Sequence, residues 1–550
     1  MHVFLFLFIT FIGTSIQAQT LPMVNTTHFA SSGNCAFCHT GLVDEAGNDV
    51  SIDSHWRSAM MANSAKDPYF LAKVTAELEK FPALKSTIEK TCANCHMPMA
   101  KTQSTFNQEE IGIFGSGYLD PNHPFHSPAR DGVSCTLCHQ IQSGNLGQEP
   151  SFSGGYTIDA NTEKPDRPIF SPFQVDFPNP MINASQFTPV TGAHIKQSAL
   201  CGSCHTLYTP YLDENGEIAG VFPEQTIFLE WRHSAYSADT AEGKSCQDCH
   251  MPVAVGGVKT SIMPPQVNPK SPFGQHHFLG GNVFMVRLMN ENREDLQLTA
   301  NERHMQATLD RTIAQLTQAT AKVEIVDTQF EDRFLYVDIH IQPLTGHKYP
   351  SGFPSRRAWL HVTVEDQNGT VIFESGRPNP DGTITGNIAD TDPIAYEPHY
   401  DRIEHEDQVQ IYQSVMGNTQ NEVTYTLLSA AGYIKDNRLL PTGFDKATAE
   451  TDYKPWGRAE TDANFQAGSD RIRYSVEVAD YTGPFRVTVR FLHHAVGFPF
   501  ARDLESTPTE QVKRFLRQYQ AADHTPTTVA EAEKEAITRP TTIPDWHLQP

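Results

Sequence analysis

Five copies of one short motif constrain this sequence more than any other feature. Each copy reads Cys-X-X-Cys-His, and together the copies contain all ten cysteines of the 550-residue chain. The copies are unevenly spaced, and no cysteine follows Cys249. The cysteine pairs are Cys35 and Cys38, Cys92 and Cys95, Cys135 and Cys138, Cys201 and Cys204, and Cys246 and Cys249; the histidines that follow them are His39, His96, His139, His205 and His250.

This spacing has a chemical reason. Two thiols three positions apart can both form thioethers with one porphyrin, and the adjacent histidine can then ligate the iron as the proximal ligand. A random order of the same residues would give roughly 0.01 such motif, so five copies are decisive. The sequence therefore predicts five covalently bound c-type haems, attached through the ten cysteines.

Other uses of paired cysteines explain the pattern less well. A disulfide framework suits short secreted chains and does not require a histidine after every second cysteine. Structural zinc normally uses two Cys-X-X-Cys halves for each ion, and five motifs cannot pair evenly. Thioredoxin-type chemistry accounts for Cys-X-X-Cys but not for the histidine or the repetition. With every cysteine assigned to haem, we expect no disulfide bond.

Charge and composition narrow the class of partner. Hydrophobic residues make up 39% of the chain and charged residues 19%, values typical of a folded globular protein. The formal net charge is −23, and haem propionates would add to it. Nucleic-acid binding requires clustered Lys and Arg, so we expect no nucleic-acid partner. Because the predicted haems are redox groups, we expect redox partner proteins instead.

The N-terminus is typical of an export signal. The apolar run 3–12 is too short to span a bilayer, and small residues near Ala18 offer a cleavage site. The segment before the run has no Lys or Arg, and a buried N-terminal strand is the alternative. We expect a signal peptide over 1–18 and export to the periplasm or cell surface. No later stretch is apolar and long enough for a membrane helix, so the chain should not span a membrane.

Motif placement and periodicity suggest a multidomain α+β chain. We expect an irregular and α-helical pentahaem domain over 19–290, whose chain wraps around the haems. Apolar residues at three- and four-residue spacing from Met305 to Leu316 predict a connecting helix within 291–321.

The period then changes to two. Alternating runs such as 335–341 and 485–491 predict an all-β sandwich over 322–500, with a type I′ hairpin turn at Asn368–Gly369. The segment 501–550 should form a short helix and a tail, with the helix capped by Thr507. The oligomeric state is not indicated by these patterns.

The sixth ligand of each iron must come from elsewhere in the chain, a water or a substrate. The 24 histidines exceed the need, and those in or beside the haem half are the better candidates. Met60 or Met61 is an alternative ligand. His399 is expected in an exposed loop and His493 in the core, partnered by hydrogen bonds. We choose as distal ligands His55, His126, His194, His277 and His347; the wider group also contains His123, His233 and His276.

Several longer strings resemble the exported multihaem c-type cytochromes, including those with a cytochrome c-552/c-554-like haem domain. The resemblance covers most of residues 30–500. It implies electron transfer through closely packed haems, most of them with two histidine ligands. The strings are Trp56–Met61 with Asp67–Phe70, Cys95–Ala100, Gly132–His139, Gly346–Gly352 with Arg356–Leu360, Glu397–Tyr400 and Lys435–Pro441.

Two classes of function remain open. In the first, the haems pass electrons between redox partners and every iron has both axial ligands. In the second, one iron keeps an open face and acts on an inorganic nitrogen or sulfur compound. All five motifs are regular, which favours an electron carrier over an enzyme, although fold and cofactor do not fix function. No catalytic residue can be assigned from the sequence.

Overall fold

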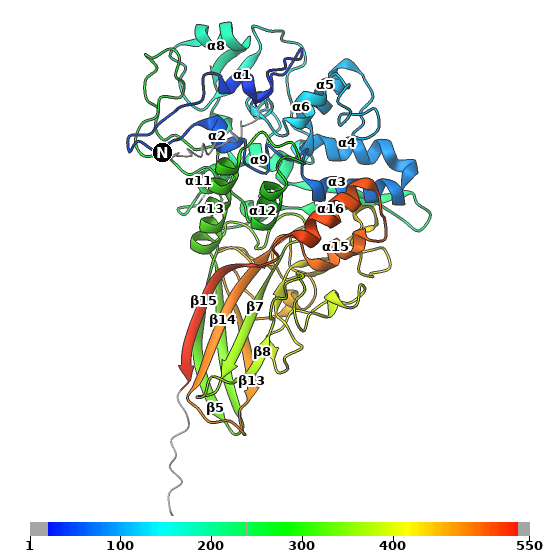
Figure 1. Ribbon diagram of the computed structural model, residues 1–550, viewed down its shortest axis with the longest axis vertical. Helices are drawn as coiled ribbons and strands as arrows, with labels where there is room; N and C mark the ends of the chain where they lie inside the picture. The colour runs from blue at the N-terminus through cyan, green and yellow to red at the C-terminus, as the bar shows by residue number, and fades with distance from the viewer. Residues whose placement is uncertain (1–19, 238–239, 537–550) are drawn as a thin grey trace, which may run out of the picture.

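The computed structural model describes residues 20–237 and 240–536 and divides into two halves (Figure 1). Helices and irregular chain dominate the first half, and long strands dominate the second (Figure 1). The expectation of a mixed α+β chain is confirmed. The predicted signal peptide lies outside the described residues. No helix in the described part of the chain is long and apolar enough to cross a membrane.

Short helices carry the cysteine motifs in the helical half. A helix places residues i and i+3 on one face, so both thiols of a motif point to the same side. Among the described residues, the α-helices of this half are α1 (Ser32–Ala36), α2 (Ile52–Trp56), α3 (Pro68–Lys80), α4 (Lys85–His96), α5 (Pro98–Asn107), α6 (His126–Arg130), α7 (Cys135–Cys138), α8 (Pro178–Ser185), α9 (Ser198–His205), α10 (Ile227–Arg232), α11 (Cys246–His250) and α12 (Val283–Glu291).

Two small sheets and three single turns of 3-10 helix complete this half. The first sheet is parallel and the second is an antiparallel hairpin. Its strands are β1 (Pro168–Ser171) with β2 (Thr188–Thr191), and β3 (Leu207–Leu212) with β4 (Ile218–Gln225); the turns are η1 (Pro82–Leu84), η2 (Glu149–Ser151) and η3 (Ala193–Lys196).

The predicted connecting helix is α13 (Glu302–Ala319). Its N-cap is Asn301, whose side chain accepts a hydrogen bond from the backbone N–H of His304. Met305, Leu309 and Leu316 are buried, as the apolar spacing predicted. The chain passes directly from α13 into the first long strand, so this helix joins the two halves.

Two larger sheets share one apolar core in the strand-rich half. Residues 335, 337, 339 and 341 are fully buried, whereas the residues between them are partly exposed, which confirms the period of two. The first sheet runs β5 (Ala321–Glu331), β6 (Phe334–Pro343), β13 (Asp470–Glu477), β9 (Arg402–Ile403); the second runs β10 (Ile411–Tyr412), β7 (Arg357–Glu365), β14 (Phe485–His494), β15 (Thr527–Ala536), with β8 (Val371–Ser375) paired to β7.

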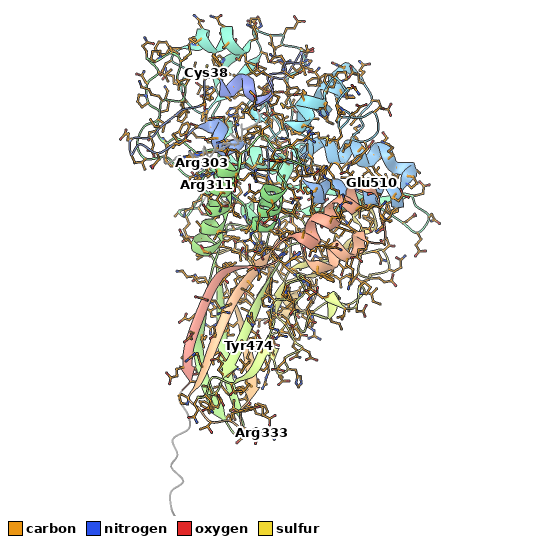
Figure 2. The ribbon with its side chains drawn as sticks, viewed as in Figure 1. Cys38, Arg303, Arg311, Arg333, Tyr474 and Glu510 are labelled. Carbon is orange, nitrogen blue, oxygen red and sulfur yellow. The ribbon has the colours of Figure 1, made fainter. Side chains whose placement is uncertain are left out.

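Short elements fill the connections of this half. Strand β11 (Ser414–Gly417) pairs with β12 (Gly432–Asp436) in a separate hairpin-like sheet. The remaining short elements are η4 (Ile388–Asp390), η5 (Leu427–Ser429) and α14 (Arg458–Thr461). Tyr474 lies within the shared core and Arg333 at the far end of the strands, whereas Cys38 lies in the helical half (Figure 2).

The C-terminal segment differs from its prediction. Helices α15 (Phe498–Leu504) and α16 (Glu510–Ala521) contact α3 of the helical half, and Thr509, not Thr507, caps α16. The chain then returns to the second sheet as β15, which pairs with β14. The expectation of a tail after the helix was wrong here. Strand β15 lies at a sheet edge, carries many charged residues and has few β-branched ones, so its sequence does not show the usual pattern of a strand.

The hairpin between β7 and β8 also differs in detail. The strands pair as predicted, but five residues separate them and only Gly369 has a positive φ, +78°, so Asn368 does not form a type I′ turn. The backbone N–H of Gly369 donates to the Asp366 carbonyl, which closes a longer loop. A type I′ turn needs positive φ at both central residues of a two-residue loop. The five-residue loop here closes with a positive φ at Gly369 alone.

Candidate functional site

All five motifs line one cavity in the helical half and at its border with the strands. The cavity has a volume of about 1790 Å³. A pocket for one drug-sized ligand has roughly 300–1,000 Å³, so this cavity suits several large groups. The ten cysteines and five histidines of the motifs all lie in its wall, although the first and last motifs are more than two hundred residues apart in sequence.

Contacts between thiols show which motifs are neighbours. The Cys35 thiol hydrogen-bonds Cys135, and this contact and burial raise the pKa of Cys35 well above its usual value. The Cys95 thiol forms the same kind of contact with Cys204, which raises the pKa of Cys95. The first motif therefore lies beside the third, and the second beside the fourth.

The fourth motif also contacts the fifth. The Cys201 thiol hydrogen-bonds Cys246, and this contact and burial raise the pKa of Cys201. The third motif comes near the fourth, because burial and then the nearby Cys204 raise the pKa of the Cys138 thiol. All five motifs thus form one connected series, with the fourth motif at its centre.

Four of the five motif histidines are oriented by a backbone carbonyl. Because a carbonyl oxygen can only accept, the ring Nδ1–H donates and the Nε2 lone pair is left for a metal. The fifth, His205, forms no such bond within the described residues. The bonds run from His39 to Thr260 O (2.6 Å), from His96 to Ser64 O (3.1 Å), from His139 to Phe170 O (2.6 Å) and from His250 to Leu279 O.

Burial keeps these rings neutral, which metal ligation requires. Burial lowers the pKa of His96 to about 4. Burial, together with the nearby charges of His250, Arg356 and His347, lowers the pKa of His205 to about 4. The His205 ring is surrounded by protein yet open to the cavity.

Two motif histidines face a second histidine at a distance that suits an iron between them. The ring centres of His250 and His347 are 6.2 Å apart with planes 10° from parallel. The centres of His139 and His276 are 6.5 Å apart with planes 18° from parallel. Two imidazoles on opposite sides of one metal, each with a bond of about 2 Å, have centres roughly 6 to 6.5 Å apart.

A buried ion network fixes the loop that carries His347. The adjacent Lys348 is fully buried, and its Nζ lies 2.7 Å from Asp436 Oδ2. Arg438 bridges Asp436 (2.8 Å) and Glu230 of α10 (2.9 Å), and Glu230 also accepts from the backbone N–H of Lys348 (3.1 Å). Burial would raise the pKa of Asp436, but Arg438 and Lys348 bring it down to about 2. The network joins the strand-rich half to the helical half.

The other chosen distal candidates lie in different settings. The rings of His55 and His277 are 4.3 Å apart, too close for an iron between them, and neither lines the cavity. His126 Nδ1 bonds the Tyr118 carbonyl at 2.9 Å. His194 Nε2 bonds the Ile141 carbonyl at 2.8 Å. Within the described part of the chain, His347 is the candidate of the five that lines the cavity.

The structure adds one ligand candidate that was not among the five chosen. His276 follows directly after Gln275 in an irregular segment, so no periodicity in the sequence distinguishes it from its neighbour His277. Met60 and Met61, the alternative ligands, also line the cavity. The role of each distal candidate remains a prediction.

His493 departs from its expected role. It was expected to be a core histidine with hydrogen-bond partners, and it is 3% exposed. However, neither ring nitrogen has a partner within the described residues, and the ring lines the cavity. Tyr349 and Arg356 lie in the same wall, and the Tyr349 and His493 rings are 5.5 Å apart.

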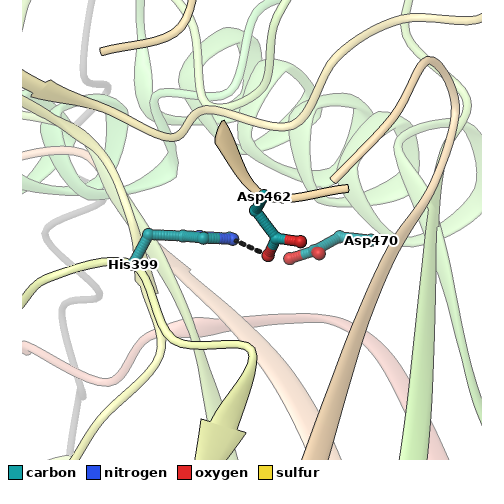
Figure 3. A group of neighbouring side chains, drawn as sticks. All are labelled: His399, Asp462 and Asp470. Carbon is teal, nitrogen blue, oxygen red and sulfur yellow. Dashed lines mark hydrogen bonds and ion pairs between the residues drawn. The ribbon is translucent and has the colours of Figure 1, made fainter. Parts of the chain in front are cut away.

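His399 was expected in an exposed loop, and this was wrong. It is 3% exposed, and its Nε2 lies 3.0 Å from Asp462 Oδ2 (Figure 3). Its Nδ1 accepts from Asn437 at 3.1 Å, so Nε2 carries the proton and donates to Asp462. Asp470 beside them accepts from the Tyr412 hydroxyl at 2.6 Å. These groups satisfy one another and do not line the cavity, which indicates a structural network.

The donor set of the cavity fits c-type haem. Paired thiols on helix faces, neutral imidazoles with Nδ1 occupied, and two opposed histidine pairs are what covalently attached, six-coordinate haem requires. The cavity wall is otherwise rich in apolar side chains, which suits a porphyrin. The same residues give no four-ligand arrangement of the kind that structural zinc uses.

Comparisons with known proteins give a match among solved structures. No protein-family model matches the chain, and no curated protein matches it. Among solved structures, the chain is similar to a penta-heme cytochrome c552 from Thermochromatium tepidum, with a TM-score of 0.48 and 15% sequence identity. The alignment covers 91% of this chain and 97% of that chain. At this degree of similarity, the function of this chain has to be inferred from its own residues.

Proposed function

We propose that this chain is an exported pentahaem c-type cytochrome that transfers electrons between redox partners. The observation that carries the proposal is the convergence of all five Cys-X-X-Cys-His motifs on one cavity. The ten cysteines would hold the porphyrins as thioethers, and His39, His96, His139, His205 and His250 would be the proximal ligands. Bound haem supplies one-electron redox chemistry at each of these positions.

The protein's own residues would set the ligation and spacing. Carbonyl acceptors hold four proximal rings in the tautomer that presents Nε2. His276 and His347 would close the third and fifth irons, because each faces a proximal ring at a suitable distance. Contacts between the motifs support a connected series of haems, as a conduit requires.

A second candidate function is supported by the surroundings of His205. Within the described residues, His39, His96 and His205 each lack a histidine ring that faces them as His347 faces His250, and His205 also lacks the carbonyl acceptor that orients the other two. If the iron at this position keeps an open face, the protein would be an oxidoreductase acting on an inorganic nitrogen or sulfur compound. Electron transfer through the connected haems would serve that reaction too.

Export and partners belong to the same proposal. Covalent c-type haem attachment fits an exported chain, and the predicted signal over 1–18 would direct it to the periplasm or cell surface. The formal net charge of −23 suits docking to a basic redox partner. Domain boundaries near 290, 321 and 500 remain predictions.

Haem quantification tests the proposal. The exported protein should carry five haems per chain by pyridine haemochrome assay, and its intact mass should exceed that of the polypeptide by five haems after denaturation. Replacing both Cys246 and Cys249 with Ala should remove one haem per chain. A chain of unmodified mass, or bound zinc in place of iron, would contradict the proposal.

A further inference from the structure

Exposed apolar side chains gather beside the first motif. Among the described residues, six of the sixteen exposed large apolar side chains lie in two short segments, 37–43 and 253–263. Single exposed apolar residues are normal on a protein, but a group of them marks an interaction site. We call this group the first-motif surface; its side chains are Phe37, Val43, Val253, Val255, Ile262 and Met263, and they are between 45% and 62% exposed.

The two segments are held together from below. The backbone N–H of Glu45 donates to the Val255 carbonyl at 3.1 Å. Leu42 and Ala254 are buried in one small apolar cluster, whereas the next residues in sequence, Val43 and Val255, are exposed. The exposed valines therefore lie on a packed support that fixes their positions.

The second segment is bonded directly to the first motif. The His39 ring donates from Nδ1 to the Thr260 carbonyl at 2.6 Å, and the Ile262 N–H donates to the Cys38 carbonyl at 3.0 Å. Cys38 lies toward the end of the molecule opposite to Arg333 (Figure 2). An electron at the first motif is therefore close to this surface and remote from the strand-rich half.

Bound haem would cover only part of the first-motif surface. Phe37, Val253 and Met263 also line the cavity, so a porphyrin held by the first motif would contact apolar side chains there. The other three side chains of the surface are not in the cavity wall, and they stay exposed when the cavity is filled. The surface thus extends from the cofactor site out to the solvent.

Charge selects the kind of protein that fits this surface. The segments 37–49 and 253–263 contain three carboxylates, those of Asp44, Glu45 and Asp49, and one amine, that of Lys259. The apolar centre therefore has an acidic rim, which attracts a basic protein. A second copy of this chain would bring the same acidic rim and a formal net charge of −23, so charge opposes self-association here.

We propose that the first-motif surface docks a basic redox partner protein that exchanges electrons with the haem at His39. The proposal rests on the proposed function, because it requires a haem at that position. Protein interfaces combine an apolar centre with a polar rim, and complementary charge speeds their association. In each encounter one electron passes from a reduced haem iron to the oxidised partner, or in the reverse direction, and no bond forms or breaks.

Electron transfer from zinc-substituted mitochondrial cytochrome c, a small basic protein, provides the test. Haem is first quantified in the oxidised holoprotein. The photoexcited probe then donates an electron to it, and the second-order quenching constant is measured at low and high ionic strength. Reduction by a small neutral photoreductant, flash-generated deazaflavin semiquinone, is measured in parallel because it needs no protein docking.

Two kinds of variant separate the apolar centre from the rim. The double variant V43S/V255S removes apolar area, and its matched control is V326S/V371S, at two exposed valines of the strand-rich half. E45Q removes one rim charge and keeps an oxygen for the Gly257 N–H, which donates to Glu45 Oε1 at 2.9 Å. Its control is E505Q, at an exposed glutamate after α15.

The double variant V43S/V255S should lower the quenching constant about threefold or more, because the docked state loses apolar contact. E45Q should lower it about twofold at low ionic strength, and this effect should vanish at high ionic strength because salt screens the rim. Both controls should react as the original protein does. Reduction by deazaflavin semiquinone should be equal in all variants, which shows that the haems themselves are unchanged.

Three results would overturn the proposal. Unchanged quenching in V43S/V255S, or an equal loss in V326S/V371S, would exclude docking at this surface, and five haems per chain would leave the proposed function intact. A dimer in sedimentation velocity that V43S/V255S abolishes would assign the surface to a second copy of the chain. A chain without covalent haem would overturn both proposals, and the initial haem assay identifies that case.

Discussion

The fourth and fifth motifs are neighbours with different surroundings. At the fifth, His250 donates to a backbone carbonyl and faces His347 at 6.2 Å between ring centres. At the fourth, His205 has neither contact within the described residues and lies near Arg356 instead. The same Cys-X-X-Cys-His motif therefore occurs in one setting that suits a closed iron and in another that suits an accessible one.

The difference arises from the strand-rich half. One loop supplies His347 to the fifth motif, and two residues later the same loop supplies Tyr349 to the cavity wall. The ion network of Lys348 and Asp436 holds this loop against α10. The second half thus contributes more than a cover for the cavity, because it supplies the ring that faces His250.

Replacing His347 should have the largest effect on this comparison. H347A should convert one low-spin haem per chain to high-spin, because the fifth iron loses its distal ligand. EPR of the oxidised protein measures the change, and added imidazole should reverse it. H405A, at an exposed histidine of the strand-rich half, is the control. An unchanged spectrum in H347A would show that another residue ligates this iron.

Breaking the ion network should have the next largest effect. D436N removes the carboxylate shared by Lys348 and Arg438, and we expect a loss of about 3–5 kcal/mol in the free energy of unfolding, because buried Lys348 loses its carboxylate partner and Arg438 keeps only Glu230. Urea unfolding measures it. D338N, which breaks the more exposed pair with Arg473, should cost less than about 1 kcal/mol. Equal losses in the two variants would contradict a special role for the network.

Glu224 should make stability depend on pH near the second and fourth motifs. Burial raises its pKa from an ordinary 4.5 to about 7, so the native state holds the proton more tightly. Its contribution is fully present below pH 4.5 and declines as pH rises to about 7. Relative to E224Q, the original protein should lose up to about 3 kcal/mol over this window.

Unfolding free energies at a series of pH values check the Glu224 prediction. E505Q, at an exposed glutamate after α15, should change with pH as the original protein does. If E224Q and the original protein have parallel pH profiles, Glu224 does not titrate in this window.

Asp67 should have the smallest effect. Burial raises its pKa to about 6, and its carboxylate caps α3 while lying near Arg356. D67N keeps a good cap, so stability should change by less than about 0.5 kcal/mol. Urea unfolding measures the change. A loss of more than about 1.5 kcal/mol would contradict a capping role that Asn can fill.

The sequence predicted the local features well. The five motifs, the helix from Met305 and the alternation over 335–341 are local patterns, and the structure shows the expected helix and strands. His347 was chosen because it lies in a turn that could cross between the halves, and it does line the cavity. These predictions succeeded because neighbouring residues determine them.

The missed features depend on long-range packing. His276 and His277 are adjacent, so sequence alone could not show which of them faces His139. His493 alternates with core residues, and its contact with the cavity depends on residues from three separate segments. Strand β15 is recognisable only through its pairing with β14. The buried setting of His399 likewise arises from partners distant in sequence.

The most direct test is low-temperature EPR and near-infrared magnetic circular dichroism of the oxidised holoprotein, with haem counted per chain. We predict five covalent low-spin haems, with bis-histidine signals that include the His139 and His250 centres. A stoichiometric high-spin signal, expected first at the His205 centre, would contradict the electron carrier and favour the oxidoreductase. Fewer than five haems would contradict the account of the cavity itself.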